Sequence, residues 1–375
     1  MLFFTFLLAV ILVVINAIPQ LNLAQAKGFK LKPTGLAYFV GAIGNILTGN
    51  LVPISAQAET ISLSGLLKKA GERVAALLIA AVFGVILGLA GGTSAIVDFA
   101  GPSTVNGMMA GVGIILSSVA IDLMKSEKRT GAISIITALF TWSLCNTFKV
   151  PNALIWTIAV SVTFSTFDFL AIQRRRVDMA VIPEEARESE EFRFWKRAFW
   201  SDFKFMKPIF NLSAIFGGLS LICLNIGSNI SFGSITASIA GETPRLNALT
   251  VINSLADLPS ALFGGAPIET IISGTAAAPW PLAAGVVMML VCAFLLLTGV
   301  IGRLGKYIPS ASISGFLVVI GFFLTFVPNL NSVISTNNPM AGIVALGVTA
   351  LTQNAFAGVV VGTIVYVTGG LFGLL

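Results

Sequence analysis

Apolar stretches long enough to cross a membrane recur along the whole chain, and they restrict its fold more than any other feature. Examples are residues 2–18, 74–90, 282–299 and 314–327. A helix of about 20 apolar residues crosses a hydrocarbon core of about 30 Å and satisfies its own backbone hydrogen bonds. Hydrophobic residues make up 56% of the chain and charged residues only 10%, unlike a soluble domain. We therefore predict an all-α polytopic membrane protein, whose first stretch is a retained helix.

Two short segments, 49–60 and 264–275, echo each other. Each runs from a glycine through Pro-Ile (Pro53-Ile54 and Pro267-Ile268) into small polar residues and one glutamate. Proline and glycine interrupt helices, and paired interruptions in corresponding halves of a membrane protein point to a transporter's binding site. We expect both segments to be part extended and part helical.

The spacing of the echoes indicates a repeat of seven elements. Pro53 and Pro267 are 214 residues apart, and Pro102-Ser103 precedes Pro309-Ser310 by 207 residues. An odd number of elements per repeat turns the second half upside down, which is the inverted-repeat plan of secondary transporters. We expect about 14 membrane segments in a 7+7 inverted repeat with broken third and tenth segments. The elements fall near 2–20, 34–48, 51–67, 74–92, 103–124, 130–147, 151–171, 208–240, 246–262, 266–279, 281–302, 310–328, 338–351 and 353–373. The repeats are 1–171 and 208–375, joined by a charged linker, 172–207.

The basic residues predict an orientation. Of the 22 Lys and Arg residues, 20 lie in connections that follow odd-numbered elements, and only Lys149 and Arg245 do not. The positive-inside rule places those connections, including the linker, in the cytoplasm and both termini outside a cell (inner) membrane. The basic, aromatic stretch 192–200 of the linker is typical of a membrane-surface anchor, with partner docking as the alternative. The net charge of +6 follows from this topology, so we expect no nucleic-acid partner.

Signatures of enzymes are scarce. The chain has no histidine, which removes the commonest metal ligand and proton shuttle. Its three cysteines have no metal-ligand spacing, and no phosphate-binding glycine loop is present. We expect no enzymatic activity, no cofactor and no metal.

Carboxylates at membrane depth are the most informative polar residues. Glu59, Asp257 and Glu269 are candidates for such a position. A charge at the centre of a bilayer costs about 2.5–3.5 kcal/mol on insertion scales, so these residues usually line a cavity. Glu269 and Glu59 are therefore candidates for proton coupling, although Gln57 and Thr60 could simply satisfy Glu59. Asp257, which precedes Leu258-Pro259, fits the capping of a bend equally well.

Short motifs resemble the nucleobase:cation symporter-2 family, and most of all its purine (adenine, guanine, hypoxanthine) permease branch. They are the connection 242–249, the turn 261–264, the segment 267–273, the start of the third segment at 50–54, and the last two helices from Asn338-Pro339 onward. The resemblance implies a fourteen-span fold of core and gate domains, with substrate held between the third and tenth segments beside the eighth helix. It also implies proton-coupled uptake.

The chain departs from this family in three ways. The tenth-segment Glu of the family falls on Ser273, while Glu269 lies four residues earlier, which is one turn on a shared helical face. The eighth helix lacks the family's acid and carries only Asn225, Ser228, Asn229, Ser231 and Ser234. The family also has cytoplasmic termini, whereas the charges of this chain argue for the opposite orientation.

These observations predict a secondary active transporter of a nucleobase-like small polar solute, working by alternating access with a proton or another cation. The candidate solute-binding residues are Gln57, Glu59, Asn229, Ser231, Glu269, Thr270 and Ser273. A sulfate-permease-type anion transporter of the same fold and a non-transporting membrane scaffold are the alternatives. The substrate, the coupling ion and the oligomeric state stay open, with a homodimer among the assemblies considered.

Overall fold

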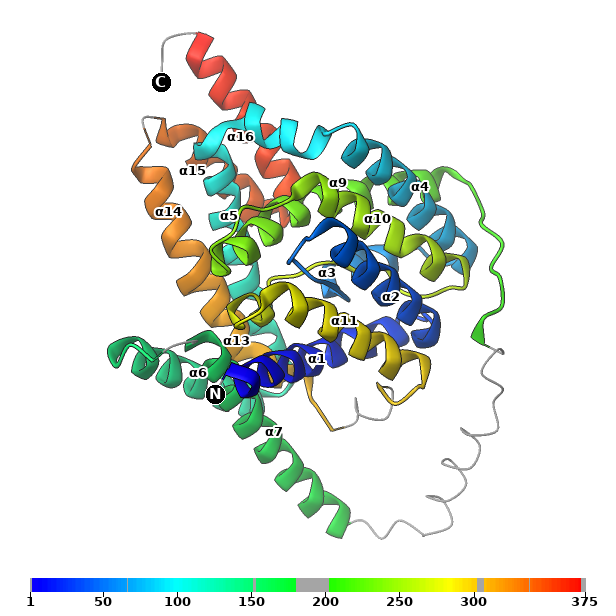
Figure 1. Ribbon diagram of the computed structural model, residues 1–375, viewed down its shortest axis with the longest axis vertical. Coiled ribbons are helices and arrows are strands. Elements are labelled where there is room, and N and C mark those ends of the chain that lie inside the picture. Colours follow the sequence, from blue (N-terminus) through cyan, green and yellow to red (C-terminus); the bar gives the residue numbers. More distant parts are fainter. Residues whose placement is uncertain are drawn as a thin grey trace.

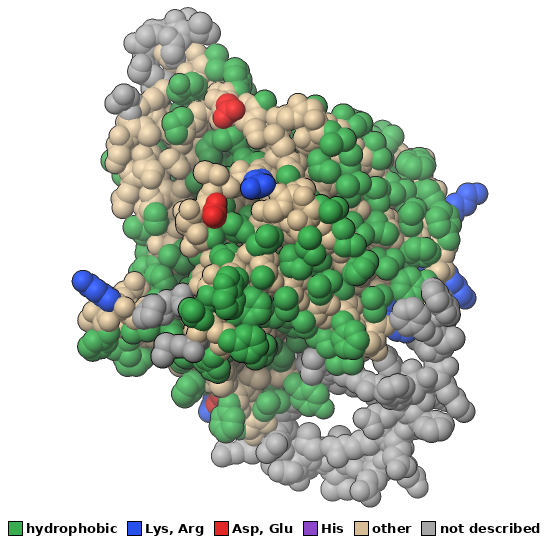
Figure 2. Space-filling model, viewed as in Figure 1, with side chains coloured by type: hydrophobic (Ala, Val, Ile, Leu, Met, Phe, Trp, Pro, Cys, Tyr) green, Lys and Arg blue, Asp and Glu red, His purple; other side chains and the backbone are tan. Residues whose placement is uncertain are grey.

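The protein is a bundle of helices in a computed structural model that describes residues 2–65, 67–150, 153–179, 202–301, 307–336 and 338–371 (Figure 1). Six of the described helices are long and apolar enough to cross a membrane. Leucine, isoleucine, valine and phenylalanine side chains are widely exposed, and hydrophobic groups dominate the visible face (Figure 2). Such a surface suits contact with lipid tails, and the chain is an all-α polytopic membrane protein.

The observed elements follow the expected order. Those of the first half are α1 (Leu2–Ala26), α2 (Leu31–Thr48), β1 (Ile54–Ser55), α3 (Ala58–Gly65), α4 (Ala70–Leu89), α5 (Gly92–Ser126), α6 (Lys128–Thr147) and α7 (Ala153–Met179). Those of the second half are α9 (Leu212–Ile239), α10 (Leu246–Leu262), β2 (Glu269–Thr270), η2 (Gly274–Ala277), α11 (Pro281–Leu297), η3 (Ser310–Ile313), α13 (Ser314–Val318), the π-helix η4 (Val319–Phe326), α14 (Val327–Ile334), α15 (Pro339–Thr352) and α16 (Ala355–Leu371).

The helices form two groups that draw on both halves of the chain. In the core group, α2 packs against α10 and α11, and α4 packs against α9 and α10. In the gate group, α5 packs against α15, α16 and η4, while α6 packs against α7 and α13. The groups meet where α9 contacts α5 and α16 and where α1 contacts α7. Figure 1 shows α14 and α15 beside α5, away from α2, α10 and α11.

The two interrupted segments meet inside the core group. β1 and β2 pair antiparallel, with Ile54 opposite Thr270 and Ser55 opposite Glu269. Before β1, the side chain of Asn45 donates to the carbonyl of Val52 at 2.8 Å. The predicted breaks in the third and tenth segments are therefore present, and antiparallel pairing is what segments related by an inverted repeat would give.

The tenth segment differs from the expectation of a half-helix. After β2 the chain makes only the four-residue 3₁₀ turn η2. Pro279 and Pro281 follow at once, and proline both lacks an N–H donor and keeps the residue before it out of helical geometry. α3, which has no such prolines, continues for eight residues.

The linker is described only at its ends. α7 runs to Met179, eight residues beyond the predicted end, and the basic, aromatic stretch 192–200 lies outside the described residues. Beyond it, the N–H of Met206 donates to Leu262 at 2.8 Å and that of Ile209 to Gly71 at 2.9 Å. Residues 202–211 are thereby fastened across α10 and α4.

Candidate functional site

A pocket lies between the core and gate groups and holds about 480 Å³ of empty space, its open mouth included. The core contributes α1, the chain around β1, the chain after β2, and α9. The gate contributes α5, α13 and η4. The lining residues are Val13, Asn16, Ala17, Gln20, Ser55, Ala56, Gln57, Leu116, Phe232, Ile271, Ile272, Phe316, Leu317 and Ile320.

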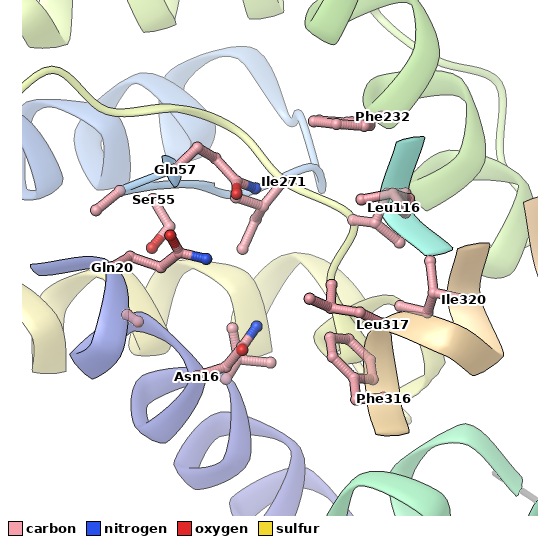
Figure 3. A pocket seen from close by; sticks show the side chains of 14 residues that line it. Asn16, Gln20, Ser55, Gln57, Leu116, Phe232, Ile271, Phe316, Leu317 and Ile320 are labelled. Atoms are coloured by element: carbon pink, nitrogen blue, oxygen red, sulfur yellow. The ribbon is translucent and has the colours of Figure 1, made fainter. Parts of the chain in front are cut away.

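The polar wall of the pocket comes from the core. Asn16 and Gln20 are one turn apart on α1, so their side chains share a face of that helix. Figure 3 shows both amides, with that of Gln57, on one side of the pocket. The Oδ1 atom of Asn16 is buried and has no hydrogen-bond partner among the described residues. A buried polar atom normally has a partner, so this oxygen or its amide suits a bound solute or water.

The opposite wall is apolar. Leu116 of α5, Leu317 of α13 and Ile320 of η4 face the amides across the pocket (Figure 3). None of the described lining residues is acidic or basic. A solute here would meet neutral donors and acceptors on the core side and hydrocarbon on the gate side.

Tyr38 fixes the strand that forms the pocket's edge. Its hydroxyl lies 2.7 Å from Ser55 Oγ and accepts the N–H of Ala56 at 2.9 Å. Tyr38 is fully buried, so this end of β1 is held by α2. Gln57 follows directly, just before α3, whose first N–H groups have no partner within the helix. The N-terminus of α3 therefore brings partial positive charge to the pocket edge.

Two of the residues predicted from the sequence, Thr270 and Asn229, belong to a buried hydrogen-bond network and do not line the pocket. Thr270 donates a hydrogen bond to Asn229 Oδ1, and Asn229 Nδ2 donates to Thr250 Oγ1 at 3.2 Å. Thr250 Oγ1 lies 3.0 Å from that of Thr93. Every member of this network is buried, so it fastens α5, α9, α10 and β2 to one another.

The predicted acids have separate places. Glu269 is fully buried in β2, and Ser228 Oγ donates to its carboxylate at 3.3 Å. Its strand partner Ser55 lines the pocket, whereas Glu269 is not among the described residues that line it. Glu59 lies on α3, but its side chain is outside the described part of the chain. Asp257 accepts the N–H of Ile268 at 2.9 Å and so links α10 to the broken segment, while α10 continues to Leu262.

The expectation that Glu269 and Ser273 share a helical face is wrong. Glu269 lies in a strand, and Ser273 precedes η2, where its Oγ accepts the N–H of Thr275 at 3.2 Å. Ser231 donates to Gly227 within its own helix at 2.7 Å and does not line the pocket. Of the seven candidates, Gln57 alone is among the described residues that line it.

Sequence reasoning missed Asn16, Gln20 and Ser55. The two α1 residues carried a usable signal, because polar residues four apart in a largely apolar helix share one face. These two side chains line a pocket because β1 and the gate helices pack near α1. Such contacts between residues far apart in the sequence could not be predicted from α1 alone.

No protein-family model matches this chain, and no curated protein matches it in sequence. Many solved structures share its fold, and two of them show the extent of the likeness. The transmembrane domain of a cyanobacterium bicarbonate transporter, BicA, aligns with a TM-score of 0.55 and 15% identity over 96% of this chain and 97% of that domain. SLC26A9 aligns with a TM-score of 0.54 and 15% identity over 99% of this chain and 66% of its own length.

This likeness shows the fold, at an identity too low to carry a substrate or a family. It extends over nearly the whole chain, so both helix groups lie within the aligned region. The resemblance to the purine permease branch stays a hypothesis.

Proposed function

We propose that this chain is a secondary transporter that carries a small anion through the pocket between core and gate by alternating access. The observation that carries the proposal is the pocket itself: it lies between two packed helix groups, at the meeting point of the broken segments. Movement of the gate against the core would open it to either side in turn.

The chemistry of the lining favours an anion over a nucleobase. The described lining has amide and hydroxyl groups and no carboxylate to accept the N–H groups of a base. The N-terminus of α3 adds partial positive charge, which favours an electronegative solute. The shared fold of a bicarbonate transporter's membrane domain adds to this argument. No described lysine or arginine lines the pocket, so amides and backbone N–H groups would hold the anion.

A nucleobase-like solute is the second candidate. The side chains of Asn16, Gln20 and Gln57 can each donate and accept hydrogen bonds, as the edge of a planar base requires. Uptake into proteoliposomes compares the two directly. We expect labelled bicarbonate or another small oxyanion to accumulate under a proton or sodium gradient, and uracil and adenine not to accumulate. Accumulation of a base without any anion would replace the proposal with the second candidate, and uptake of neither class would refute transport.

We assign coupling to Glu269, with Glu59 as its expected partner. Glu269 is buried and pairs across the strands with Ser55, which lines the pocket, so a change in the charge of its carboxylate would act on the pocket through surroundings of low dielectric constant. We expect Glu269→Gln to lose stimulation by a pH gradient while it still exchanges labelled for unlabelled solute. Unchanged stimulation in this variant would remove Glu269 from the coupling step. We place the protein in the cell (inner) membrane, with residues 172–207 in the cytoplasm.

A further inference from the structure

A second pocket lies at the end of the core group where three connections meet, and it holds about 350 Å³ of empty space. The α1–α2 connection contributes Gly28 to Lys30, the start of α4 contributes Arg73, and the segment after the linker contributes Met206. All three stretches follow odd-numbered elements, the face on which the basic residues of this chain gather. This pocket shares no lining residue with the pocket between core and gate.

Contacts with its neighbours fix the position of Arg73, and at least one of its N–H donors has no partner among the described residues. Its guanidinium lies 5.0 Å from the ring centre of Phe29, and its Nη1 donates to the carbonyl of Lys27. The buried Nε has no hydrogen-bond partner among the described residues. A guanidinium offers five N–H donors in a planar fork that matches phosphate oxygens.

The acids nearby do not neutralise this pocket. Asp202 pairs with Lys32 at 2.8 Å, while its backbone carbonyl accepts from Lys30 at 3.2 Å. Glu72 is buried and accepts from Asn211 at 2.9 Å. Arg73 and Lys30 therefore leave positive charge at the pocket.

The rest of the lining is apolar. Val74, Leu77 and Ala261 contribute aliphatic side chains, and Met206 adds a flexible thioether. A site for a free inorganic ion has no use for such a wall, whereas a lipid presents a phosphate and hydrocarbon together. Basic pockets between helices on the cytoplasmic face suit anionic headgroups.

We propose that this second pocket binds a phosphate-bearing anion, supplied in the membrane by the headgroup of an anionic lipid. Arg73 binds the phosphate, Lys30 adds charge, and the apolar wall contacts the first part of the acyl chains. The bound lipid fastens the α1–α2 connection to α4 and to residues 202–211.

Native mass spectrometry of the full chain tests this with phosphatidylglycerol and phosphatidylcholine of identical acyl chains. We expect the wild type to retain phosphatidylglycerol preferentially. Arg73→Gln should weaken that retention about ten-fold, as for the loss of a charge-assisted hydrogen bond. Lys128→Gln removes the same charge from an exposed site on α6 and should behave as wild type. If Arg73→Gln fails to fold, Lys30→Gln replaces it in the test, because this change removes a positive charge from the pocket and a hydrogen bond to the backbone carbonyl of Asp202.

Thermal unfolding with each ligand distinguishes a lipid headgroup from free inorganic phosphate as the source of the phosphate. Stabilisation by phosphatidylglycerol but not by inorganic phosphate supports the lipid. Equal stabilisation by inorganic phosphate supports the phosphate site with a soluble occupant. Equal retention of both lipids with no effect of phosphate, or equal losses in Arg73→Gln and Lys128→Gln, would overturn the proposal. Neither measurement depends on transport, so the two proposals can fail separately.

Discussion

At the scale of residues, Asn16 offers the sharpest test of the pocket between core and gate. Its Oδ1 has no partner among the described residues, so Asn16→Ala breaks no known internal hydrogen bond there. We expect the KM for uptake to rise about five-fold, equivalent to one neutral hydrogen bond, with little change in thermal stability. Gln25→Ala removes an exposed amide from the same helix and should leave uptake unchanged. Equal effects of the two variants would contradict the site.

Thr270 gives the opposite expectation, because its hydroxyl belongs to the buried network behind β2. Thr270→Val keeps the shape of the side chain but removes the hydrogen bond to Asn229. We expect the free energy of unfolding to fall by about 1–3 kcal/mol, measured as a lower Tm in detergent. Thr298→Val is the matched control, because Thr298 is exposed at the C-terminal end of α11 and its hydroxyl donates to the carbonyl of Phe294 in that helix. Normal stability with lost uptake would show instead that Thr270 contacts solute.

The sequence showed which polar residues would be buried, but it did not show which groups they would contact. Glu269, Thr270 and Asn229 stood out as polar groups in apolar surroundings, and all three are buried. Their side chains form hydrogen bonds between α9, α10 and β2. The bonded residues are about 20 to 40 positions apart in the sequence, so the pairing depends on how these elements pack. Asn16 has no such partner, and only the packed structure distinguishes it from them.

At the scale of elements, the break in α5 depends on Gly101. Its φ of 77° and ψ of 160° belong to a region that only glycine occupies readily, and Pro102 follows it. We expect Gly101→Ala to destabilise the protein by about 1–3 kcal/mol. Gly347 of α15 has open space where a Cβ would stand, so Gly347→Ala should be neutral or stabilising by up to about 1 kcal/mol. Thermal unfolding of both variants gives the comparison, and equal Tm values would contradict the strain argument.

The elements themselves followed from the sequence because each depends mainly on local features. Apolar length placed the helices, and the Pro-Ile pairs placed the extended starts of the third and tenth segments. The sequence analysis predicted a longer helix in the tenth segment, although Pro279 and Pro281 indicate that a helix ends there. The π-helix η4 had no such local signal: Gly321 approaches the backbone of Gly113, a contact across 208 residues.

At the scale of the whole molecule, the distribution of charge makes a prediction about orientation. α6 runs over residues 128–147 and is not among the six helices with the composition of a membrane span, but its 20 residues are about 30 Å long, so we expect it to cross the hydrocarbon core. Lys125, Lys128 and Arg129 lie at or just before its start, on the face that follows odd-numbered elements, and Lys149 alone follows its end before α7. The positive-inside rule therefore predicts that the start of α6 lies in the cytoplasm and its end outside.

Cysteine labelling in intact cells measures this orientation. Both test positions, Lys128 and Asn146, are exposed near opposite ends of α6, and the background variant lacks Cys145, Cys223 and Cys292. We expect a membrane-impermeant maleimide to label Asn146→Cys in intact cells and Lys128→Cys only after permeabilisation. The reverse pattern would give the protein cytoplasmic termini, as the purine permease resemblance implies. It would then move the pocket at Arg73 to the outer face, where the leaflet's negative surface potential no longer favours an anionic lipid.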